Sequence, residues 1–159
     1  MSAAVPRKLH QAERELQHGA IDAAAALCED VLRRAPRNPD ALWLLGIARL
    51  MANRAEEAVP LFERVLDATP NHGAALENLG LAHLMRGDYR NAEAALRKAG
   101  AHPAAPASVF MRLGLALLHQ ERHAEAVPEL ERALQLDPQN PDMHASLARA
   151  YAAQGRWTD

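Results

Sequence analysis

The chain has 159 residues, with 18 basic and 20 acidic side chains and a net charge of −2. This near balance gives no general attraction to nucleic acid or to an anionic membrane, so neither is expected as a partner. The single cysteine excludes an internal disulfide and a cysteine metal cluster.

A Leu-Gly pair recurs at a constant interval along the chain, at 45–46, 79–80 and 113–114. The same period predicts a short tail at 1–4 and four units at 5–38, 39–72, 73–106 and 107–140. A fifth unit at 141–159 supplies only its first half. A period of this length is typical of a stack of small, similar units rather than of one globular core.

Each unit is predicted to contain two antiparallel helices. Its apolar residues are spaced by three, four and seven positions, which places them on one side of a helix. Gly and Ala occur where the two helices would cross, since small residues let helix backbones approach closely. A proline at 36, 70 and 138 is expected to end the second helix of its unit.

In chain order, three units depart from the pattern. The first unit has Ala12 in place of Gly, so its first helix is weakly apolar and is interpreted as an N-terminal cap. In the third unit the closing proline is displaced to Pro103, which predicts that the second helix stops early and loosens the contact with the fourth unit. The fifth reaches Trp157 where its second helix would begin, which predicts a fragment of a longer protein or an end that packs on another chain.

These positions resemble the tetratricopeptide repeat family over nearly the whole chain. The Leu-Gly pairs, the Ala58 to Phe62 spacing and the closing prolines carry the resemblance. Arg49 and His83 stand where the family usually has Tyr, whereas Tyr151 matches. The resemblance implies an all-α alpha-solenoid, a right-handed superhelix of helix pairs. It also implies a non-catalytic scaffold that binds a protein, peptide or helix in its concave groove.

The same resemblance implies which side chains point into that groove from the first helix of each unit. Only Asn78 and Arg112 match the family's carboxylate clamp, so that binding mode is rejected. Most of the groove positions are apolar, which favours a hydrophobic or amphipathic ligand anchored at Trp43, Leu81 and Met111, although some leucines also belong to the core. The predicted groove residues are Trp43, Ile47, Leu50, Glu77, Asn78, Leu81, Met111, Arg112 and Leu115. Further groove positions include Met51, Met85, Ser108 and His119.

The sequence predicts no catalytic residue, metal site or cofactor, so the chain is not expected to be an enzyme. His119 and His123 have a spacing seen in zinc sites, but they straddle the break between two helices, and no third ligand is spaced to join them. His83 and His144 are expected to face the stack. No glycine-rich phosphate loop and no nucleophile turn occur.

Two alternative functions stay open, and the partner is not identified. Residues 27–32 and 40–46 look like repeat regions that precede bacterial sulfotransferase or glycosyltransferase domains, so the chain can be the N-terminal part of a larger transferase. A homo-oligomer through the exposed C-terminal end is the other alternative. No apolar stretch follows the basic residues near the start, so a cytoplasmic, bacterial protein is expected.

Overall fold

The structure, a computed structural model, describes residues 4–155. In this range every regular element is a helix, in agreement with the all-α prediction. Residues 1–3 of the predicted tail, and Trp157, lie outside the described range. The helices are α1 (Ala4–Gln17), α2 (Ile21–Arg34), α3 (Pro39–Met51), α4 (Ala55–Ala68), α5 (Gly73–Met85), α6 (Tyr89–Gly100), α7 (Ala107–His119), α8 (His123–Leu136) and α9 (Pro141–Ala153).

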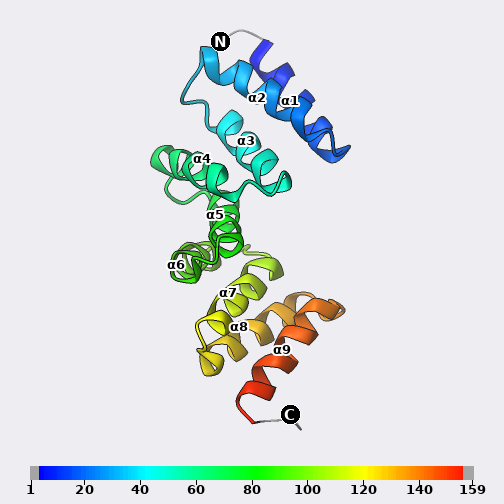
Figure 1. Ribbon diagram of the computed structural model, residues 1–159, viewed down its shortest axis with the longest axis vertical. Helices are drawn as coiled ribbons and strands as arrows, with labels where there is room; N and C mark the ends of the chain where they lie inside the picture. Colours follow the sequence, from blue (N-terminus) through cyan, green and yellow to red (C-terminus); the bar gives the residue numbers. More distant parts are fainter. Residues whose placement is uncertain (1–3, 156–159) are drawn as a thin grey trace.

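The helices form an elongated stack with α1 near one end and α9 at the other (Figure 1). Each helix packs on the next one along the chain, and the solenoid prediction is confirmed. The helices α3, α5, α7 and α9 begin at positions 39, 73, 107 and 141, which repeat the constant interval of the Leu-Gly pairs. The exact boundaries of the units stay a prediction, because the helix bounds do not fix where one unit ends and the next begins.

The glycine of each Leu-Gly pair allows the close crossing of two helices within a unit. A Cβ atom at Gly46 would lie 2.6 Å from Cε1 of Phe62, and one at Gly80 would lie 2.5 Å from Cγ of Leu96. Both distances are well inside van der Waals contact. Phe62 and Leu96 are fully buried, so the bulky side chain of the second helix fills the space that the glycine leaves.

The helix ends follow from local chemistry. The side chain of Asn38 caps α3 by accepting a hydrogen bond from the backbone N–H of Ala41 at 2.9 Å. Between α5 and α6, Gly87 has φ 72°, a conformation that suits glycine, and Asp88 then caps α6. The helices α2, α4 and α8 each end two residues before a proline, as predicted.

The third unit is irregular, as the displaced proline predicts, but only one of two expectations holds. Helix α6 has 12 residues, whereas α2, α4 and α8 have 14 each, so the early end is confirmed. The predicted loosening is wrong, because α6 packs on α7 as extensively as α4 packs on α5. Gly100 at the end of α6 explains this, since a Cβ there would lie only 3.1 Å from Cε1 of Phe110.

Candidate binding groove

The first helix of each pair lines the inner side of the curved stack. Along the described chain, the backbones of α1 and α3, α3 and α5, α5 and α7, and α7 and α9 pack on each other, whereas no two of the backbones of α2, α4, α6 and α8 do. Helices that touch along the stack lie on the shorter side of the curve, and helices that are spread apart lie on the longer side. The predicted groove residues therefore belong to the helices of the concave side.

The apolar groove residues differ in how much surface they expose. Trp43, Ile47 and Leu81 are half-buried and pack around one cluster that contains Leu50 and Leu79. Leu50 itself is only 9% exposed, so it belongs mainly to the core below the surface. Three neighbouring side chains of α3 and α5 thus present apolar surface together, over a floor that Leu50 helps to form.

The indole ring of Trp43 packs near the imidazole ring of His72. It lies 6.1 Å from the ring of His72, measured between centroids and tilted by 43°. Its Nε1 atom is buried and has no hydrogen-bond partner among the described residues. His72 is fixed in turn, because its Nδ1 atom accepts the backbone N–H of Ala75 and caps α5. This capping role of His72 was not predicted from the sequence.

Met111 and Leu115 continue the apolar surface on α7, and both are half-buried. Met111 packs against a cluster with Phe110 and Met143, whereas Leu115 packs against the larger core of the third and fourth units. The structure does not bring Met111 into the cluster that contains Trp43. The proposed anchors therefore lie along the stack in succession, which suits an extended or helical segment rather than a compact ligand.

Polar groove residues join α5 to α7. The carboxylate of Glu77 accepts a hydrogen bond from Oγ of Ser108 at 2.6 Å and is ion-paired with the guanidinium of Arg112. The side chains of Glu77 and Arg112 are 17% and 22% exposed, so this pair is largely shielded from water. Asn78 is half-buried beside it on α5. Because Glu77 already compensates the charge of Arg112, this arginine would attract a ligand carboxylate only weakly. The pairing therefore does not favour the carboxylate-clamp binding mode.

The other groove positions lie at the C-terminal ends of the inner helices. Met51 and Met85 are 47% and 41% exposed, so they present accessible apolar surface at the edge of the stack. His119 stacks on Tyr89, with the ring centroids 4.5 Å apart and the planes within 5°. The first two positions are open to a ligand, whereas His119 is engaged with α6.

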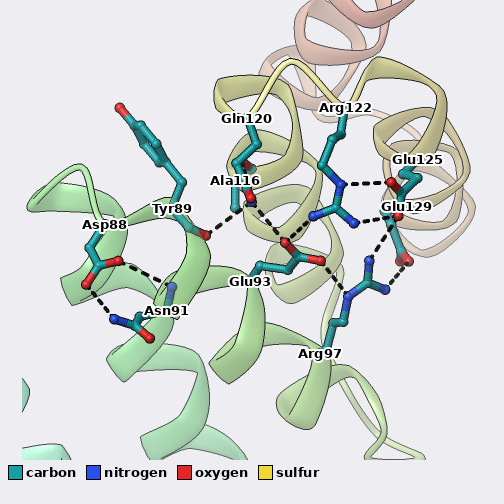
Figure 2. Close-up of polar contacts among 10 residues, drawn as sticks. All are labelled: Asp88, Tyr89, Asn91, Glu93, Arg97, Ala116, Gln120, Arg122, Glu125 and Glu129. Carbon is teal, nitrogen blue, oxygen red and sulfur yellow. Dashed lines mark hydrogen bonds and ion pairs between the residues drawn. The ribbon is translucent and has the colours of Figure 1, made fainter.

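A polar network on the outer side was missed by the sequence analysis. Figure 2 shows Glu93 of α6 between Gln120, Arg97 and Arg122. Its oxygens accept hydrogen bonds at 2.9 Å from Gln120, 2.9 Å from Arg97 and 2.5 Å from Arg122. Burial opposes ionisation of Glu93, but these three donors outweigh it and hold the pKa of Glu93 below its ordinary value. The signal was present only as glutamate and arginine on neighbouring helices, which the sequence does not place together.

The histidines do not form a metal site in the described part of the chain. His119 ends α7 and His123 begins α8, as predicted, and residues 4–155 contain no cluster of three potential metal ligands. His83 is buried, as expected. The expectation that His144 faces the stack is wrong. Its side chain is exposed, and its Nε2 atom lies 2.8 Å from the carbonyl oxygen of Pro138. Its inner neighbour Met143 is buried instead.

None of the described helices has the length and apolar character needed to cross a membrane. This finding concerns only the helices between residues 4 and 155.

Comparison with known proteins agrees with the fold. A family model described as a tetratricopeptide repeat matches residues 9–72 and 52–106, and a second with the same description matches 117–159. A structure of MamA residues 41 to the end, from Desulfovibrio magneticus RS-1, is 25% identical with a TM-score of 0.90, covering 99% of this chain and 89% of that one. A MamA structure designated AMB-1 is 26% identical with a TM-score of 0.81, covering 96% and 84%.

A further MamA crystal structure is 22% identical with a TM-score of 0.88, over 99% of this chain and 86% of that chain, so it shows the fold alone. No curated protein matches the chain. These MamA structures give no support to the transferase alternative.

Proposed function

Because the chain belongs to the tetratricopeptide repeat family and is a helical-repeat scaffold for protein interaction, we propose that its concave side binds one segment of a protein partner. The observation that carries this proposal is the row of half-buried apolar side chains on the inner helices α3, α5 and α7. Trp43, Leu81 and Met111 are the anchors. Each has part of its apolar surface exposed to water, and covering that surface favours association.

The chemistry of the groove favours an apolar or amphipathic segment. Its charged residues, Glu77 and Arg112, neutralise each other, so the groove offers no net charge to a strongly acidic or basic peptide. Met111 and the exposed Met51 and Met85 adapt their shape to a ligand, whereas the ring of Trp43 is rigid. The proposal is therefore binding without catalysis, by residues of the nine-member groove set named from the sequence.

The test compares a groove variant with a matched control. A partner is first identified by affinity capture and mass spectrometry, and its affinity is then measured by isothermal titration calorimetry. Trp43→Ala combined with Met111→Glu is expected to weaken binding by about thirtyfold, the effect of losing a typical binding hot spot. Leu136→Glu is the control, because Leu136 is 55% exposed at the end of outer helix α8. Full affinity of the groove variant would show that the groove is not the site.

Self-association through α9 is a second candidate. Ala148 occupies the repeat position that Gly114 has in the fourth unit, and the Gly114 position is covered by Leu130 of the same unit. No such side chain covers Ala148 among the described residues, and Ala148 is exposed. Light scattering over a range of protein concentrations tests this candidate. A second species that Ala148→Glu abolishes supports it, and a single monomeric mass at all concentrations contradicts it.

We also propose that the protein is bacterial and resides in the cytoplasm, as the sequence predicts. Fractionation of cells that express the tagged chain tests the location, and recovery of the protein with the membrane fraction would contradict it.

A further inference from the structure

An apolar pocket lies at the joint between the third and fourth units. Its volume is about 520 Å³, and its walls come from the start of α5, the end of α6, the 101–106 loop and α7. Most of its surface is apolar, from small residues such as Ala74, Pro106 and Val109, and Glu77 supplies a carboxylate. Glu77 is also a predicted groove position, and Ala74 precedes it on the same inner helix α5, so the pocket adjoins the concave side.

The pocket exists because the third unit lacks bulky side chains that the second unit has. Glu77 occupies the repeat position of Trp43, and Ala99 and Gly100 occupy those of Val65 and Leu66. In the second unit, Trp43 and Leu66 pack around buried Val65 and fill the space there. In the third unit a carboxylate and a methyl group take the places of Trp43 and Val65, whereas Phe110 packs against Gly100 and occupies the room there. The space that an indole ring occupies in one unit is therefore open in the next.

The carboxylate of Glu77 has one oxygen that is still without a donor. Its Oε1 atom accepts hydrogen bonds from Ser108 and Arg112. Its Oε2 atom accepts none from any residue in the described range, and Oε2 is not fully buried, so it stays accessible to water or to a ligand. An accessible carboxylate oxygen beside an apolar wall can exchange water for a ligand donor, and hydrogen bonds to charged groups are stronger than those between neutral groups. A ligand that brings an N–H or O–H group to Glu77 would supply it.

We propose that this pocket receives a tryptophan side chain of the partner segment, with the ring against the alanine and proline walls and the indole N–H donating to Glu77. The inference rests on the proposed function, and it names the side chain that one part of the groove recognises. Tryptophan combines a large apolar ring with one donor, which matches an apolar pocket that has one free acceptor. Leucine brings no donor for Glu77, and lysine brings a donor but no ring to cover the apolar walls.

The probe for the test is N-acetyltryptophanamide, titrated into the ¹⁵N-labelled chain and followed by NMR. We expect saturable shifts of the amide signals of Gly73, His102 and Ala104, which belong to the pocket walls. The 1-methylindole analogue cannot donate a hydrogen bond and should bind about tenfold more weakly, the usual loss for a bond to a charged group. The absence of saturable shifts, or equal binding of the two probes, would overturn the proposal.

A matched pair of variants checks that the probe occupies this pocket. Ala74→Leu fills the pocket from the exposed surface of α5, whereas Ala94→Leu places the same side chain on the exposed surface of α6. We expect Ala74→Leu to abolish the shifts and Ala94→Leu to leave them unchanged. Unchanged binding to Ala74→Leu, in a variant whose spectrum shows a folded chain, would contradict the assignment.

Failure of the pocket and failure of the groove are distinguishable. If the probe does not bind, but the Trp43 and Met111 variant weakens the identified partner, the pocket is wrong and the groove stands. If the probe binds at Ala74 and that groove variant keeps full affinity for the partner, the pocket is supported and the groove assignment fails.

Discussion

Replacing Gly80 by alanine tests the helix crossing on which the fold depends. The new Cβ would lie 2.5 Å from Cγ and 2.7 Å from Cδ2 of Leu96, whereas carbon atoms in contact are about 3.5–4.0 Å apart. Leu96 is fully buried, so it can yield only if α6 moves with it. Overpacking of this kind costs about 1–3 kcal/mol. The better helix propensity of alanine returns about 0.5–1 kcal/mol, so the free energy of unfolding should fall by about 1 kcal/mol, the difference between the middles of the two ranges.

The measurement is urea unfolding, followed by far-ultraviolet circular dichroism and by tryptophan fluorescence. Coincident transitions and an unchanged slope would justify a two-state analysis, which repeat proteins do not always allow. Leu96→Ala alone should cost about 2–5 kcal/mol because it leaves a cavity. The double variant should cost less than the sum of the two, since the Cβ of residue 80 then has room. A Gly80→Ala chain as stable as the wild type, or strict additivity, would refute the reasoning.

Three further predictions concern single side chains. Asn38→Ala should lower the free energy of unfolding by about 1 kcal/mol through loss of the α3 cap, and Asn71→Ala, in the exposed turn before α5, should not. Burial, reinforced by Glu29, raises the pKa of Cys28 to about 11. The folded chain should therefore resist iodoacetamide at neutral pH, and rapid labelling would contradict the assigned burial. Burial lowers the pKa of His83 below 6.5 despite the nearby Asp88, so the unfolded chain binds this proton more tightly. Stability should then fall as the pH drops below 6.5, and His83→Tyr should reduce that fall; an identical pH profile would contradict it.

The fold could be predicted because each unit repeats the same local rules. The Leu-Gly pairs and the closing prolines act within a few residues of themselves, so the sequence shows where helices cross and end. The strength of the joint between the third and fourth units depends instead on how Gly100 meets Phe110, which lies on another helix. The displaced proline predicts the early end of α6, but it does not predict the close contact between Gly100 and Phe110.

The candidate site was predicted less completely, for the same reason. Periodicity places Glu77 and Arg112 on the inner helices, yet only the structure shows that the two are paired and shielded. It likewise shows that Leu50 lies in the core. The whole groove set stays a prediction as a binding site. The pocket beside Glu77 exists because smaller side chains stand at repeat positions where the second unit has large apolar ones. The sequence shows this difference only when the units are compared position by position.

The outer polar network is expected to make the stiffness of the stack uneven along its length. Arg122 is tied to Glu93 at 2.5 Å, and Arg97 reaches Glu125 at 3.5 Å, so long charged side chains brace α6 against the start of α8. Between α4 and α6, the described residues provide no such brace. We therefore expect the stack to bend most easily between the second and third units, next to Trp43 and Leu81, which would let the groove adjust to ligands of different width. Because added salt screens these ion pairs, it is expected to let the C-terminal half bend more easily.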